Sequence, residues 1–403
     1  MSRRIMPVLC ALMGAVMLGL VMANALMLNA HASDESGESL PLESSVPFEL
    51  NSGSALLMEA STGRVIYQKD ADMRRPVASV TKLMPLLLIF EALDTGRCTL
   101  DDQVTVSRRA ESMGGSQALL DAGSTYDFEV LLKSIIVGSA NDSTVALSEY
   151  LYGSEEAMVA RMNDRAAELG MNDTNFVNTT GLPAEGHYTT ARDIATLSQQ
   201  VLTHEEYFNY STIWLDELVH PSGRITQLTN TNRLTRLYDG CDGLKTGSTN
   251  EAGYCMSATA KRGDMRLIAV VLGASSSSAR FDDAEALLDH GFANYEMYTA
   301  ARKGDIVEQA FPVIGGDPES VDIVLDGDCV TLIERGGASN IRLERTLPDE
   351  LHAPLSAGQR VGSVRVMQGE RVLREIDAVV AEDVCTRGLG EGLMRVIRLW
   401  LYR

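Results

Sequence analysis

The order of strand and helix patterns along residues 53–294 limits the possible fold more than any other feature of this sequence. A β-hairpin pattern opens the segment at residues 55–67, and strand patterns return only at residues 241–246, 254–259 and 266–272. Helical patterns fill the space between, at residues 79–92, 127–137, 142–152, 155–169 and 191–202, and a last helix follows at 279–294. Strands at both ends with helices between them favour one α+β unit, whose sheet combines the first hairpin with the late strands.

The pattern changes after about residue 302. Short alternating runs at residues 321–325, 360–366 and 372–376 are separated by Gly, Asp and Pro turns, which is typical of a small all-β domain. The sequence therefore predicts a first domain over residues 51–300 and a sandwich-like β domain over residues 301–385.

The N-terminus has the parts of a secretory signal. Arg3 and Arg4 precede an apolar run, and Ala30-His31-Ala32 supplies small residues at a cleavage site, so residues 1–32 are predicted to be a signal peptide. An uncleaved membrane anchor is the alternative, because the apolar run is long enough to span a bilayer. Residues 33–50 contain five acidic and no basic residues and are expected to form a flexible leader. Either interpretation places the bulk of the chain outside the cytoplasm.

The C-terminal residues 386–403 form an amphipathic pattern. Leu389, Leu393, Val396 and Trp400 share one helical face, and the segment carries four Arg and one Glu. Such a helix is predicted to lie on the extracytoplasmic face of the cell membrane. The alternative is a helix that packs on its own domain.

Composition excludes some functions. A formal charge of −20 argues against a nucleic-acid partner, which requires a basic surface. Six cysteines without a CxxC pair and six histidines without a spaced partner predict no metal, so His187 is expected to have a structural role. No cofactor is expected either.

The first candidate for chemistry is Ser79-Val80-Thr81-Lys82 at the start of the first long helix. A spacing of three places the Ser79 hydroxyl and the Lys82 amine on one side of a turn. A serine is a weak nucleophile unless a nearby base takes its proton, and a lysine can do so only if its pKa is lowered. On its own this pattern is common.

Two further triplets strengthen the assignment. Ser139-Ala140-Asn141 lies in the break between two helices, and Lys245-Thr246-Gly247 ends a strand. A lysine supplies positive charge there, a threonine donates a hydrogen bond, and glycine allows close approach to the backbone. In this order, the three motifs are the S-x-x-K, S-x-N and K-T-G set of the penicillin-recognising serine enzymes.

The wider sequence resembles the serine-type D-Ala-D-Ala carboxypeptidases, the low-molecular-weight penicillin-binding proteins. The similar segments cover most of the chain and include residues 75–84, 137–142, 169–193, 242–255 and 358–384. The resemblance implies a serine β-lactamase/penicillin-binding-protein-like domain, in which an antiparallel sheet carries a helical subdomain. It also implies hydrolysis of the terminal D-Ala-D-Ala bond of peptidoglycan stem pentapeptides and acylation by β-lactams.

The same resemblance assigns the roles. Ser79 would attack the penultimate D-Ala carbonyl with Lys82 as its base, Ser139 would pass a proton to the leaving amine, and Asn141 would orient Lys82 and the substrate amide. The remaining predicted site residues would bind substrate. Lys245 and Thr246 would bind the free carboxylate, and Gly247 would let the substrate approach the backbone. The backbone N–H groups of Ser79 and Ser248 would hold the oxyanion.

Some features depart from the family or leave alternatives open. Pro85 lies inside the predicted nucleophile helix and would kink it if unrelieved, and Ser248 replaces a common His or Tyr. Glu168 resembles the deacylating glutamate of β-lactamases, so a β-lactamase or a DD-endopeptidase on the same scaffold is an alternative. A catalytically silent wall-binding protein is another. Arg233, with Asn230 and Asn232 ahead of the third motif, is expected to lie in a surface turn, and the alternative is that these residues line the cleft.

Overall fold

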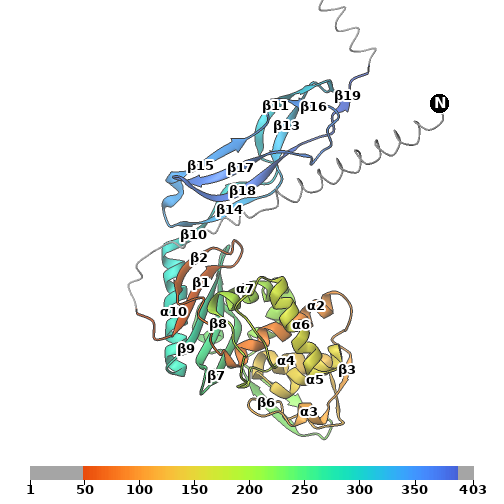
Figure 1. Cartoon of the computed structure of the whole chain (residues 1–403), viewed down its shortest axis with the longest axis vertical. Coiled ribbons are helices and arrows are strands. Elements are labelled where there is room, and N and C mark those ends of the chain that lie inside the picture. The colour runs from red at the N-terminus through yellow and green to blue at the C-terminus, as the bar shows by residue number, and fades with distance from the viewer. Residues whose placement is uncertain (1–48, 389–403) are drawn as a thin grey trace, which may run out of the picture. The chain divides into compact units, whose positions relative to one another are not determined.

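The computed structural model describes residues 49–388 (Figure 1). The predicted signal peptide, nearly all of the acidic leader and most of the predicted C-terminal amphipathic helix lie outside the described residues. The prediction that this helix begins at residue 386 is wrong, because Cys385–Thr386 forms a short strand (β19). Within residues 49–388, no helix has both the length and the apolar character needed to cross a bilayer.

A five-stranded antiparallel sheet organises the first part of the chain, in the order β2-β1-β9-β8-β7. The first hairpin supplies β1 (Ser54–Glu59) and β2 (Val65–Lys69). The late strands are β7 (Cys241–Thr249), β8 (Gly253–Arg262) and β9 (Met265–Ala274). The prediction that the hairpin and the late strands share one sheet is confirmed, and β7, which carries the third motif, is an edge strand.

Both faces of this sheet are covered. In β9, Leu267, Ala269 and Val271 face one apolar cluster, and the intervening residues of the strand face another. The helix α10 (Ser277–Asn294) covers the first face, and α7 (Ala191–Val201) and α2 (Leu83–Asp94) lie on the second side (Figure 1). Burial on both faces explains why β9 is a continuous apolar run without alternation.

The predicted helices are confirmed to within about two residues at most ends. The middle helices are α4 (Phe128–Gly138), α5 (Asn141–Tyr152) and α6 (Glu155–Glu168). The sequence analysis missed several short elements: β3 (Gln103–Thr105), α3 (Arg108–Glu111), β4 (Thr125–Asp127), α8 (Phe208–Ser211), β5 (Leu215–Val219), β6 (Ile225–Thr229) and α9 (Leu234–Leu237). They are too short to show a clear period.

The nucleophile helix begins differently from the prediction. Residues 79–92 were expected to form one helix, but Ala78–Lys82 is a 3₁₀-helix (η1) and α2 begins at Leu83. Pro85 therefore lies in the first turn of α2, where backbone N–H groups have no helical acceptor and proline is tolerated. The expected kink is relieved because the proline falls at this boundary.

The remaining residues form an all-β region, as predicted, but its first strand begins at Tyr295 and not at the predicted residue 301. A six-stranded sheet has the order β15-β17-β18-β13-β11-β16. Its strands are β11 (Ile306–Ile314), β13 (Ser320–Leu325), β15 (Ile341–Thr346), β16 (Leu351–His352), β17 (Arg360–Gln368) and β18 (Arg371–Val380). Two small sheets pair β10 (Tyr295–Ala301) with β14 (Cys329–Glu334), and β12 (Gly316–Asp317) with β19 (Cys385–Thr386). In β13, Val321, Ile323 and Leu325 point into the core at every second position.

Candidate active site

The short helix η1 brings the first motif together. A 3₁₀-helix has three residues per turn, so residues i and i+3 lie directly above one another. The Lys82 Nζ is accordingly 2.9 Å from the Ser79 Oγ. Lys82 is fully buried, whereas Ser79 is partly exposed. The Lys82 amine also donates to the main-chain oxygen of Thr180 at 2.7 Å.

Close packing holds this turn in place. Ala78 has a φ of +48°, which is uncommon for a residue with a side chain. The loop around Gly181 runs against it, because a Cβ on Gly181 would lie 1.9 Å from the Ala78 oxygen. Only glycine allows the two backbones to approach so closely, and Gly181 also has a φ of +77°.

The second motif lies where α4 ends and α5 begins. Ser139 ends α4 in the left-handed conformation, with a φ of +60°, and its Oγ accepts a hydrogen bond from the Lys245 Nζ at 2.8 Å. Asn141 is buried and donates from Nδ2 to the main-chain oxygen of Gly114 at 2.6 Å. Its Oδ1 is buried without a hydrogen-bond partner, so it is available to accept from a ligand or a neighbouring amine.

The third motif lies on the edge strand β7 beside the nucleophile. A Cβ added to Gly247 would lie 2.7 Å from the backbone nitrogen of Ser79, so glycine allows β7 to pack directly on η1. Lys245 and Thr246 are buried, and Ser248 is exposed. The contacts of Ser79 with Lys82, of Gly247 with Ser79, and of Lys245 with Ser139 bring all three motifs into one site.

The two lysines of the site have lowered pKa values. Burial, followed by the positive charge of Lys245, holds the pKa of Lys82 well below its ordinary value, although Asp142 opposes this effect. Burial, followed by the charge of Arg280, lowers the pKa of Lys245 to about 7. Lys82 can therefore be neutral, as a base requires, beside a lysine that is partly charged at neutral pH.

The segment from Asn230 to Arg233 corrects a prediction. A surface turn is expected there, and Thr231 is indeed exposed and Arg233 partly exposed. The expectation is wrong for Asn230 and Asn232, which are buried. Asn232 donates to the main-chain oxygen of Gly243 at 2.9 Å, and the Thr231 Oγ1 accepts from the Thr246 Oγ1 at 2.7 Å. These side chains satisfy groups on an edge strand that has no further strand beside it. The segment therefore supports the third motif.

Arg280 is a site residue that sequence reasoning missed. It lies in the first turns of α10, is almost fully buried, and directs its guanidinium at the main-chain oxygens of Gly247 (3.3 Å) and Cys255 (3.4 Å). Burial lowers its pKa to about 10. The helix pattern covered this residue, but nothing in the local sequence distinguishes it from a solvated arginine.

His187 makes structural contacts, in agreement with the prediction. Its Nδ1 accepts from the backbone N–H of Val177 (3.1 Å), which leaves Nε2 to donate to the Thr81 Oγ1 at 2.8 Å. Burial lowers its pKa to about 4, so the ring is neutral at physiological pH. Within residues 49–388 no group of three or more His, Cys, Asp or Glu side chains is placed to hold a metal ion.

A groove of about 460 Å³ adjoins the nucleophile turn. Val77, Ala78, Leu182 and Pro183 line it. Thr249, just beyond the third motif, also lines it. The site combines a Ser–Lys pair whose lysine is fully buried, two further polar motifs and an adjoining groove. On an antiparallel sheet with a helical subdomain, these features define the class of serine β-lactamases and penicillin-binding proteins.

Comparisons with known proteins refine this class. The family model described as D-alanyl-D-alanine carboxypeptidase matches residues 41–276, and the model described as penicillin-binding protein 5, C-terminal domain, matches residues 295–386. The chain is 38% identical to D-alanyl-D-alanine carboxypeptidase DacF of Bacillus subtilis, over 86% of this chain and 89% of the relative. It is 32% identical to DacD of Escherichia coli, over 93% and 96% of the two chains.

A solved structure of the same family is also similar to this chain. Penicillin-binding protein 5 from Haemophilus influenzae matches with a TM-score of 0.76 and 28% identity, over 85% of this chain and all of that one. The chain belongs to the D-alanyl-D-alanine carboxypeptidase family. It is a serine-type enzyme of that family, with the fold of the low-molecular-weight penicillin-binding proteins.

Proposed function

We propose that this enzyme removes the terminal D-Ala from peptidoglycan stem pentapeptides through an acyl-serine intermediate. The observation that carries the proposal is the 2.9 Å contact between the Ser79 Oγ and the Nζ of a fully buried Lys82. Burial favours the neutral amine, which can take the proton of the serine hydroxyl.

The proposed reaction has two steps. The Ser79 Oγ attacks the carbonyl carbon of the penultimate D-Ala while Lys82 takes its proton. The backbone N–H groups of Ser79 and Ser248 stabilise the oxyanion, each contributing about 3 kcal/mol. Ser139 then passes a proton to the leaving amine nitrogen, the C–N bond breaks and D-Ala departs. Water hydrolyses the ester and restores the serine.

Substrate orientation is assigned to the third motif. Lys245 supplies positive charge and Thr246 a hydroxyl for the free carboxylate of the substrate, and a β-lactam carboxylate can take the same place. Asn141 has an unpartnered Oδ1 that is suited to accept from the substrate amide or from Lys82. The groove beside Val77 and Ala78 is available for the part of the peptide that precedes the two D-Ala residues.

The experiment that tests the mechanism is covalent labelling with a fluorescent penicillin, with the wild-type protein beside Ser79→Ala. We expect stable labelling of the wild type and none of the variant, together with D-Ala release from a peptide ending in D-Ala-D-Ala. An unlabelled wild type, or a labelled Ser79→Ala, would contradict the acyl-serine mechanism.

A β-lactamase is the second candidate, and the placement of Glu168 argues against it. Glu168 lies at the end of α6 with a half-exposed side chain, where it pairs with Arg161 (2.6 Å) and Arg165 (3.0 Å). A carboxylate engaged there does not activate water at the ester of Ser79.

Rapid turnover of penicillin, with no persistent acyl-enzyme, would favour the β-lactamase. Cleavage of cross-linked dimeric peptides would instead indicate an endopeptidase, and inactivity on every substrate a silent binding protein.

We also infer that the enzyme works at the extracytoplasmic face of the membrane, held by the helix of residues 386–403. The support is the sequence pattern, which combines a Trp/Leu face with four arginines. Truncation after Thr386 is expected to release the mature protein from membranes in a sedimentation assay. A truncated protein that still sediments would place the anchor in an uncleaved N-terminus.

A further inference from the structure

The main-chain oxygen of Thr180 holds Lys82, although Thr180 belongs to none of the three motifs. Its distance to the Lys82 Nζ is 2.7 Å, and both residues are buried. A neutral amine has two N–H bonds and one lone pair. When one N–H is directed at the Thr180 oxygen, the remaining directions of the nitrogen are restricted, and the lone pair can be turned toward the Ser79 hydroxyl. The position of this carbonyl therefore affects how closely the lone pair of Lys82 is directed at the Ser79 hydroxyl.

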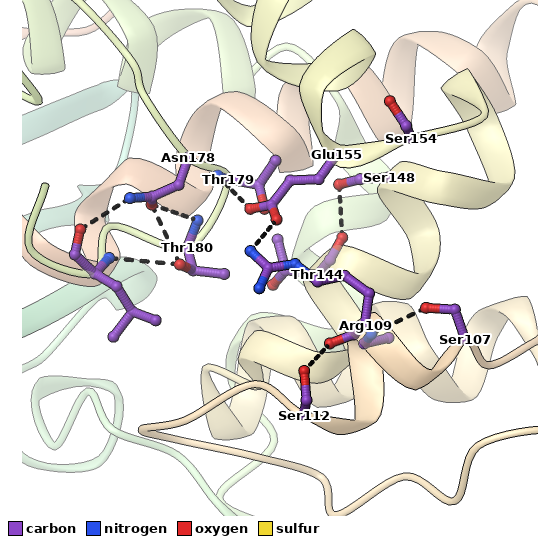
Figure 2. A network of polar contacts seen from close by, with 12 residues as sticks. Ser107, Arg109, Ser112, Thr144, Ser148, Ser154, Glu155, Asn178, Thr179 and Thr180 are labelled. Atoms are coloured by element: carbon purple, nitrogen blue, oxygen red, sulfur yellow. Dashed lines mark hydrogen bonds and ion pairs between the residues drawn. The ribbon is translucent and has the colours of Figure 1, made fainter.

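Asn178 fixes the loop that carries the carbonyl. Its Oδ1 accepts from the backbone nitrogens of Thr180 (3.2 Å) and Gly181 (2.7 Å), and also from the Thr180 hydroxyl (3.2 Å). Its Nδ2 donates to the main-chain oxygen of Leu182 at 2.9 Å. One side chain thus joins both sides of the Thr180 peptide unit. Figure 2 shows the contact of Asn178 with Thr180.

Glu155 holds the same loop from the other direction. This carboxylate is buried at the start of α6, and its Oε1 accepts from the backbone nitrogen (3.3 Å) and the hydroxyl (3.1 Å) of Thr179. Its Oε2 pairs with Arg109 at 2.8 Å, and Figure 2 shows the glutamate between Thr179 and this arginine. A negative charge at a helix N-terminus is also favoured by the helix dipole.

We propose that Asn178 and Glu155 are positioning residues for the base of this enzyme. They fix residues 178–182 so that the Thr180 oxygen directs the Lys82 amine at Ser79. The proposal rests on the proposed function, because it takes Lys82 as the base. Neither side chain touches the substrate or the reacting atoms, so both act only through the loop.

The test compares the full chain with Glu155→Ala, Glu155→Gln and Asn178→Ala. The second-order rate constant for acylation by a fluorescent penicillin is measured below the unfolding temperature of the least stable variant. Both alanine variants are expected to acylate about 100-fold more slowly, because a displacement of about 1 Å at a reacting group has an effect of this size. Glu155→Gln is expected to stay close to the wild-type rate, since its amide oxygen can still accept from Thr179. The side chain of Arg109 is 59% exposed and can turn to solvent.

Ser148→Ala is the matched control. Its hydroxyl is buried in the same region and donates to the main-chain oxygen of Thr144 within α5, without contact to the loop (Figure 2). Its acylation rate is expected to equal that of the wild type. If Glu155→Ala does not fold, Asn178→Ala still tests the loop, because it removes the acceptor of the Thr180 and Gly181 backbone nitrogens. A wild-type rate for that variant overturns the proposal.

The other outcomes distinguish a failure of the proposed function from a failure of the positioning role. A wild type that is not labelled contradicts the proposed function itself. A labelled wild type with a wild-type rate for Glu155→Ala contradicts only the positioning role. A Glu155→Gln variant as slow as Glu155→Ala also contradicts it, because the negative charge and not the contact with Thr179 would then matter.

Discussion

At the residue scale, the site depends on two buried lysines with different requirements. Burial and the charge of Lys245 lower the pKa of Lys82. Burial and the charge of Arg280 lower the pKa of Lys245. A base must be neutral, whereas a group that binds a carboxylate must be charged. Lys245 donates hydrogen bonds to the Ser139 Oγ and to the Thr246 main-chain oxygen, which favour its charged form, whereas burial favours the neutral form of Lys82.

These shifts predict a bell-shaped dependence of acylation on pH. The rate is expected to rise with pH as Lys82 loses its proton, and to fall again as Lys245 loses its charge near pH 7 in the free enzyme. The measurement is the acylation rate constant between pH 4 and 10. A β-lactam whose carboxylate is esterified serves as the control, because it should keep the acidic limb and lose the alkaline one. Identical profiles for the acid and the ester would contradict the role of Lys245.

At the element scale, the packing of an edge strand on a short helix determines the site. The strand β7 contacts η1 directly, and glycine at position 247 is what allows it to do so. A second close approach occurs at Gly181, on the loop that holds Lys82. Three backbone segments therefore form the site: η1, β7 and the loop around Gly181. They pack at these two glycines without a side chain between them.

Gly247→Ala is expected to abolish most of the acylation while the fold persists. The new Cβ would lie 2.7 Å from the Ser79 nitrogen and 2.7 Å from the Val77 oxygen, so β7 and η1 must separate. A loss of about 100-fold or more in the acylation rate is expected from such a displacement. Gly327→Ala is the control, because a Cβ there meets no atom within 4 Å and its φ is not positive. A Gly247→Ala enzyme with the wild-type rate would show that this contact is not needed.

Pro85→Ala is expected to have little effect on stability. The proline lies in the first turn of α2, where its missing N–H costs nothing, so the change in free energy of unfolding should stay within about 1 kcal/mol. Chemical denaturation monitored by circular dichroism measures this change in the free energy of unfolding. A proline within the helix would instead destabilise it by roughly 3 kcal/mol, and its replacement would stabilise the protein by a similar amount.

At the scale of the whole molecule, charge is divided unevenly along the chain. The formal net charge is −20, yet the C-terminal residues 386–403 carry four arginines and one glutamate. The proposed membrane attachment uses this division, because an anionic surface repels acidic groups and attracts basic ones. Arg387 is the arginine of this segment that lies within the described residues, and it is bound to the β domain through Glu319 (2.6 Å) and the main-chain oxygen of Gly316 (2.8 Å).

Binding to vesicles should therefore depend on the arginines beyond Arg387. Replacement of both Arg395 and Arg398 by Gln is expected to weaken binding to phosphatidylglycerol vesicles roughly 30-fold, since each basic residue contributes about 1 kcal/mol at an anionic surface. Co-sedimentation at two salt concentrations measures this effect, and added salt should reduce wild-type binding. Arg387→Gln is the control and should bind like the wild type. Equal binding of all three proteins would contradict the electrostatic attachment.

The sequence by itself determined the element types, the α+β class, the all-β region and the identity of the motif residues. Periodicity is a local property, so it was sufficient for long helices such as α6 and for the apolar strands. It failed for the short hairpin of β5 and β6 and for the 3₁₀ start of the nucleophile helix, because fewer than about six residues show no clear period.

Only the tertiary structure decided which groups surround the base. Ser139 contacts Lys245 across 106 positions of sequence, and Lys82 contacts Thr180 across 98. Arg280 and Glu155 have no local signature, because their importance comes from burial and from partners that are distant in the chain. The lowered pKa values of the two lysines follow from the same cause: desolvation is a property of the folded environment, and no sequence motif contains it.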